Sequence, residues 1–184
     1  LPFERGTLWD VRGVTFKGCL FRNTAGNVFP IGNKGLGIYS IDATYNIDQF
    51  CTNNTNPCTV PIKSEFKGFD HGVYVDNTNP LRVVSITNTN FYENYSNSTY
   101  FNNVNTPVFT DNYINTPANI ACGLYLNNCK YYNVKNNTFL QDNTQPNRSD
   151  VGIYVNNSQA GSHQIYRNNF GNFVVGIGAM HNNS

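Results

Sequence analysis

The sequence has few charges and no long apolar run. Only 12% of its 184 residues are charged, and the formal net charge is +1. It has no basic run, which argues against nucleic acid or an anionic membrane as the main partner. No run of 18 apolar residues occurs, so the sequence predicts no membrane span. Apolar residues at helical spacing are also missing, which disfavours helices.

Asparagine and aromatic residues are abundant instead. The sequence contains 33 Asn, 12 Tyr and 13 Phe. Disordered chains lack aromatic and β-branched residues, so this composition predicts a folded chain despite its low complexity. Asn tolerates the left-handed backbone region and favours turns. Many Asn between short apolar runs therefore predict many short strands joined by tight turns.

Two short phrases alternate along the chain. The first reads "GVYVDN", "GLYLNN" or "GIYVNN", and its copies begin at Gly37, Gly72, Ser98, Gly123, Gly152 and Gly176. The second is an apolar residue, a few others, then an aromatic. Its copies run over 16–21, 62–66, 86–91, 108–113, 134–139 and 165–170.

This repetition predicts the fold class. Self-similarity at such a period is typical of a solenoid. Each phrase alternates with period two, as a strand does, so that Val73 and Val75 face one way and Tyr74 faces the other. The Leu-rich consensus of leucine-rich repeats is missing. The sequence therefore predicts an all-β fold, a right-handed parallel β-helix of six coils with roughly 24 residues each. We expect one domain over 1–184, as a fragment of a longer chain.

Stacked coils predict rows of equivalent residues. Such residues should lie one strand spacing apart, about 4.8 Å. The Gly that opens each phrase is expected in a bend that other residues could not adopt. The residue that closes each phrase is expected to form a hydrogen-bonded ladder like those of other stacked β structures. Its members are Asp42, Asn77, Asn103, Asn128 and Asn157.

The tyrosine of each phrase should point outward and form an aromatic strip. Its members are Tyr39, Tyr74, Tyr100, Tyr125 and Tyr154. Flat aromatic surfaces with a hydroxyl tip suit sugar rings, so we predict ligand binding there. The alternative is that the strip packs under loops or stabilises cross-strand pairs.

Five cysteines bear on the compartment. Cys51 and Cys58 end the polar stretch "CTNNTNPC", which predicts a disulfide within an inserted loop over 43–61. A disulfide fits an oxidising compartment. No histidine lies near these two cysteines, which disfavours zinc. The pairing of the others stays open: Cys19, Cys122 and Cys129.

Catalytic candidates are few. Asp70 and His71 are adjacent, and Asp76 lies near the end of the same strand. An acid beside an imidazole is compatible with acid–base chemistry, but adjacent strand residues face opposite sides. The sequence therefore assigns no catalytic residue beyond these three candidates, and it predicts no metal site and no cofactor.

Several segments resemble a known group of proteins. "RGVTFKGCLF", "GIYSIDA", "FKGFDHGVYVDN" and "VKNNTF" are similar to right-handed β-helix repeat proteins, which include pectate lyase-like proteins. The closer resemblance is to secreted cell-surface β-helix proteins of Bacteroidota that are exported by the type IX route. This resemblance implies the fold and an extracellular or cell-surface location, but no particular activity.

Three functions follow as expectations. The leading one is a non-enzymatic structural or adhesive segment of a secreted cell-surface protein, which binds glycan or a surface protein. The alternative is a carbohydrate-active enzyme, a polysaccharide lyase or glycoside hydrolase, with its cleft on the β-helix. A phage tailspike or fibre is third. An enzyme would bring acidic and basic side chains from two or three adjacent coils into one groove.

Overall fold

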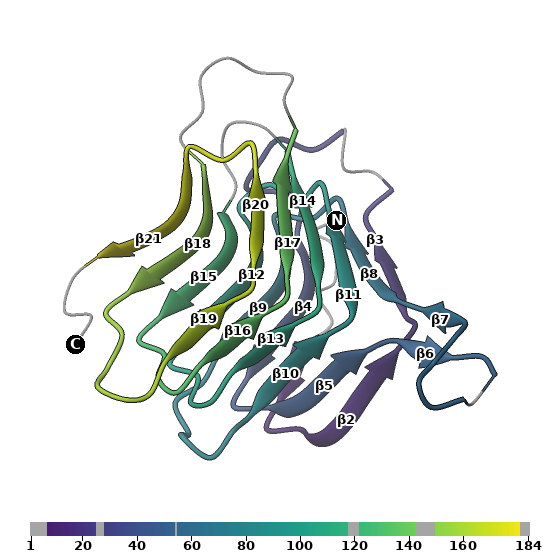
Figure 1. The fold of residues 1–184 in the computed structure, drawn as a ribbon, viewed down its shortest axis with the longest axis horizontal. Coiled ribbons are helices and arrows are strands. Elements are labelled where there is room, and N and C mark those ends of the chain that lie inside the picture. The colour runs from purple at the N-terminus through teal and green to yellow at the C-terminus, as the bar shows by residue number, and fades with distance from the viewer. Residues whose placement is uncertain (1–6, 25–27, 54, 118–121, 143–149, 181–184) are drawn as a thin grey trace.

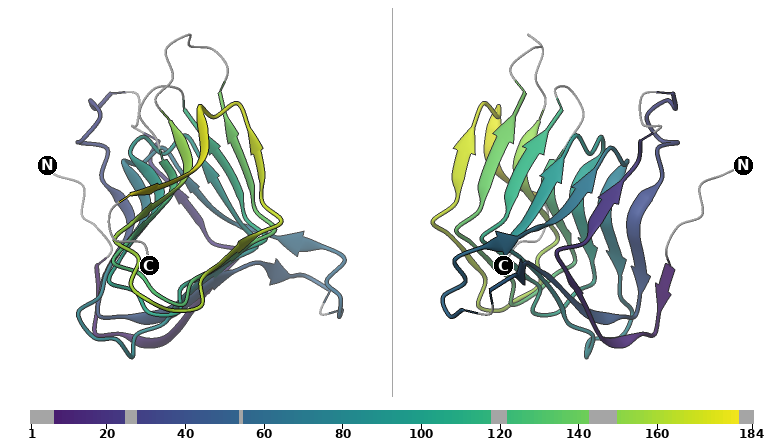
Figure 2. Two further views of the ribbon diagram at one scale, coloured as in Figure 1. Left: turned by 60° about the vertical axis from the view of Figure 1, so that its left-hand side comes forward. Right: turned by 90° about the vertical axis from the view of Figure 1, so that its right-hand side faces the viewer.

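The chain winds into a right-handed parallel β-helix, as the sequence predicts. The computed structural model describes residues 7–24, 28–53, 55–117, 122–142 and 150–180. Strands, turns and bends make up this part of the chain, and no helix occurs in it. Three parallel sheets form the walls, and each coil contributes one strand to each wall in turn (Figures 1 and 2).

The three walls are called sheets A, B and C in the order in which each coil visits them. Sheet A consists of β1 (Thr7–Trp9), β4 (Leu36–Ile41), β9 (His71–Asp76), β12 (Asn97–Asn102), β15 (Cys122–Asn127), β18 (Val151–Asn156) and β21 (Val175–Met180). Sheet B consists of β2 (Arg12–Lys17), β5 (Thr44–Asp48), β10 (Val84–Thr87), β13 (Val108–Thr110), β16 (Asn133–Lys135) and β19 (Gln164–Tyr166). Sheet C consists of β3 (Leu20–Arg22), β8 (Ser64–Lys67), β11 (Thr89–Tyr92), β14 (Tyr113–Thr116), β17 (Thr138–Gln141) and β20 (Asn169–Gly171).

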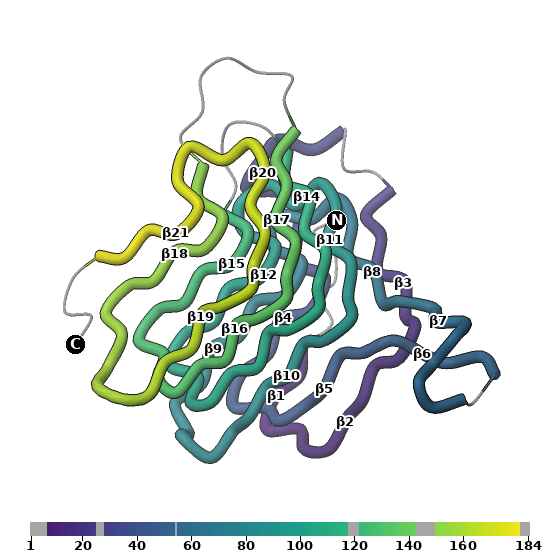
Figure 3. The backbone as a smooth tube through the Cα atoms, in the orientation of Figure 1, coloured from purple at the N-terminus to yellow at the C-terminus, as the bar shows by residue number. Residues whose placement is uncertain are grey.

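The strand register stacks the core residues in rows, and Figure 3 shows the turns of the chain lying one against the next. In sheet B, Ile86 pairs with Phe109, and in sheet C, Phe91 pairs with Ile114. The fourth copy of the second phrase therefore runs from Phe109 to Ile114, one residue later than expected, because Val108 and Tyr113 face outward.

A disulfide-linked hairpin interrupts the second coil. Strands β6 (Phe50–Cys51) and β7 (Pro61–Ile62) pair antiparallel and project from the stack in Figure 1. Cys51 and Cys58 form a disulfide, as predicted. The insertion is narrower at its start than the expected 43–61, because 44–48 form strand β5 of sheet B. The second phrase of this coil is accordingly split, with its apolar residue at Ile47 before the hairpin and Phe66 after it.

The glycines of the first phrase are required by close packing rather than by a bend. Their φ angles lie outside the left-handed region. A Cβ on Gly123 would lie 2.6 Å from the carbonyl oxygen of Gly152 and 2.6 Å from the ring of Phe139. The same kind of contact, with the next coil's carbonyl and a ring of sheet C, occurs at Gly37, Gly72 and Gly152.

One coil lacks both the glycine of the first phrase and the phenylalanine of sheet C. The register places Ser98 where the neighbouring coils have Gly72 and Gly123. In the same coil, Ile114 replaces the phenylalanine of sheet C. The smaller Ile side chain leaves room for the Ser side chain, and the ring of Phe109 from sheet B lies between those of Phe91 and Phe139, at 6.0 and 6.3 Å.

This pairing predicts a coupled effect on stability. Gly123→Ser should lower the free energy of unfolding by about 1–3 kcal/mol, because its side chain meets both the Phe139 ring and the carbonyl oxygen of Gly152, and only the first contact is relieved by a smaller residue at 139. Combining it with Phe139→Ile imports the Ser98 and Ile114 pair, so the double variant should be less destabilised than the two single effects summed. Urea unfolding of the three variants measures this coupling. Strictly additive losses would contradict it.

Candidate functional site

The predicted tyrosines form one row across the outer face of sheet A. The register pairs Tyr39 with Tyr74, Tyr74 with Tyr100, Tyr100 with Tyr125, and Tyr125 with Tyr154. Successive ring centroids lie 5.5, 4.7, 5.0 and 4.8 Å apart. Each side chain is partly exposed.

Neighbouring rings of this row lie against one another, which limits access to their faces. Tyr74 and Tyr100 stack with an interplanar angle of 17°, and the other pairs are tilted. Ring edges and hydroxyl groups are therefore what the row offers to a partner. Burial, together with the neighbouring Tyr74 and Tyr125, raises the pKa of Tyr100 to about 12, so its hydroxyl stays protonated at neutral pH. Ligand binding by the row stays a prediction.

A ladder of side-chain amides runs beside the tyrosines. Asn102 donates to Asp76 over 2.8 Å, Asn127 donates to Asn102 over 2.8 Å, and Asn156 donates to Asn127 over 2.7 Å. These residues are the last of their strands and point outward, like the tyrosines two positions before them. The continuous ladder therefore lies one residue before the position selected from the sequence.

The selected residues instead turn the corner from sheet A to sheet B. Four of them take left-handed φ angles between 49° and 55°: Asp42, Asn103, Asn128 and Asn157. Asn77 is buried and donates to the carbonyl oxygen of Arg82. Asn157 donates to Asn128, which is one side-chain rung between these positions. Corner geometry rather than coil-to-coil bonding thus accounts for most of this row.

Asp42 fixes the corner of the next coil. Its carboxylate accepts hydrogen bonds from the backbone and hydroxyl of Thr78 and from the backbone of Asn79, at 2.6 to 2.7 Å. Burial opposes the charged form, but these hydrogen bonds and the nearby Arg82 hold the pKa of Asp42 below its usual range. The carboxylate is therefore engaged within the fold.

A second amide ladder, missed by the sequence analysis, lies inside the corner between sheets B and C. The Asn112 side chain accepts from the backbone of Thr89, Asn137 accepts from the backbone of Asn112, and Asn168 accepts from the backbone of Asn137. The signal was present in the sequence, because each Asn precedes the sheet C core residue by two positions. The ladder supports the corner, and its members Asn112 and Asn137 are buried.

The three catalytic candidates serve separate roles. The buried Asp70 carboxylate accepts from the backbones of Gly32 and Lys34, at 2.8 and 2.7 Å, and so holds the loop before β4. Asp76 begins the amide ladder. His71 faces outward, with Nδ1 located 3.2 Å from the amide nitrogen of Asn97.

His71 is poorly matched to acid–base work at neutral pH. Its ring lies edge-on to Tyr74 at 5.3 Å between centroids. Burial lowers the pKa of His71 to about 4, although the nearby Asp70 opposes this shift. A general base works best with a pKa near the operating pH. The imidazole therefore supports the packing of the tyrosine row more readily than catalysis.

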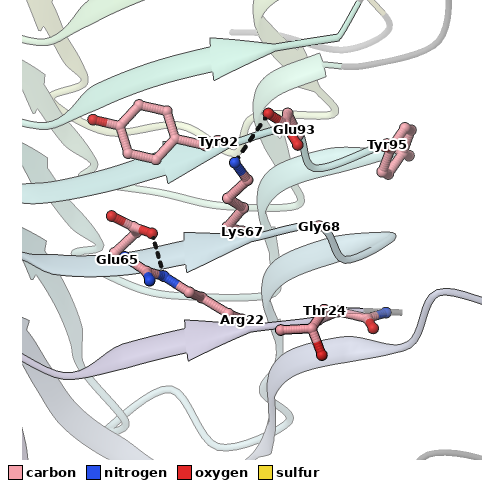
Figure 4. Close-up of a pocket in the computed structure, with 9 residues that line it drawn as sticks. Arg22, Thr24, Glu65, Lys67, Gly68, Tyr92, Glu93 and Tyr95 are labelled. Carbon is pink, nitrogen blue, oxygen red and sulfur yellow. Dashed lines mark hydrogen bonds and ion pairs between the residues drawn. The ribbon is translucent and has the colours of Figure 1, made fainter. Parts of the chain in front are cut away.

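A groove on the outer face of sheet C was not found from the sequence. Arg22, Lys67 and Tyr92 occupy one outward row on three successive coils. Glu65 and Glu93 lie beside them and form ion pairs with Arg22 at 2.8 Å and with Lys67 at 3.2 Å (Figure 4). The cavity measures about 610 Å³. The available signal was weak, because the four charged residues stand singly around the closing aromatics of three copies of the second phrase and form no run.

A smaller groove follows the corner between sheets A and B. It measures about 350 Å³ and is lined mainly by amide groups, including Asn103, Asn105, Asn128 and Gln159, with Lys130 as its charged residue. Asn103 and Asn128 directly follow Asn102 and Asn127 of the outer ladder. The amide surface of sheet A therefore continues around this corner.

The described ranges contain neither a metal-binding cluster nor a membrane-spanning helix. There, no cluster of three or more His, Cys, Asp or Glu side chains could hold a metal ion. The same residues include no helix that is long and apolar enough to cross a membrane. Cys19, Cys122 and Cys129 are free thiols.

Comparison with known proteins yields no relative. No protein-family model, no curated protein and no solved structure matches the chain.

His71 predicts a pH dependence of stability. Because its folded pKa is about 4 and the unfolded value is near 6.5, the unfolded chain binds the proton first as the pH falls. The free energy of unfolding should therefore decrease between about pH 6.5 and pH 4. His71→Asn, which imports the equivalent Asn97, should reduce this decrease. Urea unfolding across the interval tests it, and identical pH profiles for the two proteins would count against this role for His71.

Proposed function

We propose that this chain is a non-enzymatic adhesive segment of a secreted cell-surface protein, and that the outer face of sheet A binds an extended glycan. One observation carries the proposal. The tyrosine row and the amide ladder run side by side across the coils, with Tyr100 beside Asn102, Tyr125 beside Asn127, and Tyr154 beside Asn156 on the same strands. The same pair of groups is thus presented repeatedly along the stack.

The chemistry of these two rows suits a polyhydroxylated chain. Tyrosine hydroxyls and asparagine amides each donate and accept hydrogen bonds. The row would recognise its ligand mainly through hydrogen bonds at the hydroxyl tips, because neighbouring rings lie 4.7 to 5.5 Å apart and limit access to the ring faces. Because the strands repeat at about 4.8 Å, a long ligand can meet a similar set of groups on every coil. Weak contacts of this kind add up along an extended ligand.

Rigidity supports an adhesive role. Parallel strand pairing continues through every coil of sheet A, and the core residues beneath it are buried. Repeat proteins of this kind present extended binding surfaces. Such a surface is already formed before the ligand binds, so binding costs little reorganisation. The Cys51–Cys58 disulfide supports an oxidising, extracellular location. The same proposal includes the lineage and the export route that the resemblance implies, namely Bacteroidota and the type IX route.

The alternative, a carbohydrate-active enzyme, has one observation in its favour. Acidic and basic side chains from three adjacent coils converge in the groove on sheet C. Each carboxylate there already has a cationic partner, since Glu65 pairs with Arg22 and Glu93 with Lys67. Such pairs suit the holding of hydroxyl groups better than the protonation of a glycosidic oxygen, which requires a carboxylic acid.

Removing hydroxyl groups from the tyrosine row tests the proposal. Tyr100→Phe and Tyr125→Phe keep the ring stacking but lose the hydroxyls, so the fold should persist. Each should weaken retention by roughly two- to tenfold, the effect of one lost hydrogen bond of about 0.5–1.5 kcal/mol. Affinity electrophoresis in gels that contain xylan, mannan, glucan or polygalacturonate measures retention.

Tyr166→Phe is the matched control, because Tyr166 is exposed on sheet B, away from the row. It should leave retention unchanged. If both row variants migrate like the wild-type protein in every gel that retards it, sheet A is not the binding face.

A further inference from the structure

We propose that the groove on sheet C is a separate binding site for a neutral pyranose sugar, such as a terminal or short oligosaccharide unit. This site lies on a different wall from the tyrosine row and goes beyond the adhesive function proposed for sheet A. The groove volume of about 610 Å³ is within the range of small-molecule sites, ~300–1,000 Å³.

The charges of the groove are concentrated and balanced. The whole chain has 12 Lys and Arg and 11 Asp and Glu, yet two of each sign meet here from three coils. Arg22 and Lys67 are direct register partners, and like charges placed opposite each other on a sheet are destabilising. Glu65 and Glu93 offset them, so the four charges sum to zero.

This balance favours a neutral ligand. An acidic sugar would meet two cations that already have carboxylate partners, and a basic ligand would meet two carboxylates that already have cationic partners. A neutral sugar adds no charge, so the charge balance of the groove is unchanged when it binds. Each of its hydroxyls donates and accepts hydrogen bonds, so neighbouring hydroxyls can use a cationic donor and a carboxylate acceptor together.

Aromatic side chains flank these polar groups. Figure 4 shows Tyr92 and Tyr95 on opposite sides of the Lys67–Glu93 pair. Aromatic rings at the margins of a polar groove provide apolar contact for the C–H faces of a sugar. The groove therefore offers an apolar contact on each side and paired hydrogen-bond donors and acceptors between them. This arrangement is complementary to a pyranose ring.

Contacts from the neighbouring turn hold Tyr95 in place. The ammonium group of Lys34 lies 4.2 Å from the centre of the Tyr95 ring, which is a cation–π contact. The backbone of Lys34 is itself held by the Asp70 carboxylate. Asp70, assigned from the sequence as a catalytic candidate, therefore acts as a positioning residue for one wall of the groove.

Glu93 occupies a corner position of its coil. Its φ angle is 53°, in the left-handed region, and the equivalent residue of the preceding coil is Gly68 with φ 83°. This backbone conformation recurs at other corners of the fold, such as Asp111 and Asn136. A glutamate at this turn places a second carboxylate in the groove, where a glycine would provide none.

The experiment is a titration with short sugars, namely neutral gluco-, manno- and xylo-oligosaccharides and acidic oligogalacturonides. The proteins are the wild type, Glu65→Gln and Tyr95→Leu, with isothermal titration calorimetry as the readout. The wild type should bind at least one neutral series in preference to the acidic one. Each groove variant should weaken that binding by about tenfold or more.

Matched controls separate the groove from general effects. Asp111→Asn removes an exposed carboxylate that accepts from Asn136 outside the groove. Tyr166→Leu removes a ring that faces Lys135 much as Tyr95 faces Lys34. Both should bind like the wild type, and circular dichroism should show that all four variants are folded.

Several results would overturn the proposal. They are no binding of any neutral series, preference for the acidic series, or unchanged affinity of folded Glu65→Gln and Tyr95→Leu. Release of new reducing ends from the sugar during the titration would also overturn it, because the groove would then cleave its ligand. Tyr100→Phe and Tyr125→Phe should not alter this titration, so failure of this site is distinguishable from failure of the sheet A face.

Discussion

In-register hydrogen bonding between parallel strands is the constraint on which the rest of the structure depends. Every coil must place its strand over the equivalent strand of the coil before, at about 4.8 Å. A residue type at one position is therefore repeated as a row along a wall. Rows that face inward must fill one common interior, and rows that face outward form continuous stripes on the surface.

The inward rows show how strict this constraint is. Gly123 leaves room for Phe139 and for the next coil's backbone, while the coil that carries Ser98 has Ile114 instead of phenylalanine. That coil also carries Phe109 where its neighbours have Ile86 and Val134, so a change at one inward position is accompanied by changes at others. Outward rows are freer. The tyrosine row continues across five strands, whereas the outer face of sheet C changes from charged to aromatic residues between Lys67 and Tyr92.

Much of the architecture was predictable because repetition is visible in a single sequence. The fold class and the alignment of the tyrosines follow from phrases that recur at a regular period. The Cys51–Cys58 disulfide follows from the short polar stretch between these two cysteines. The ladder was placed one residue late, because a sequence does not show where a strand ends and a corner begins. Asn102 and Asn103 are both asparagine, yet the first is the last outward strand residue and the second is the left-handed corner.

The sequence by itself determined the winding of the chain and the rows on its walls, since local alternation and period suffice to specify both. Tertiary structure alone decided which isolated charges meet. Arg22, Lys67 and Glu93 are spread over more than 70 residues, and no spacing in the sequence links them. Closure of three coils brings them to one groove, because stacking converts a separation of about one coil in sequence into one strand spacing in space.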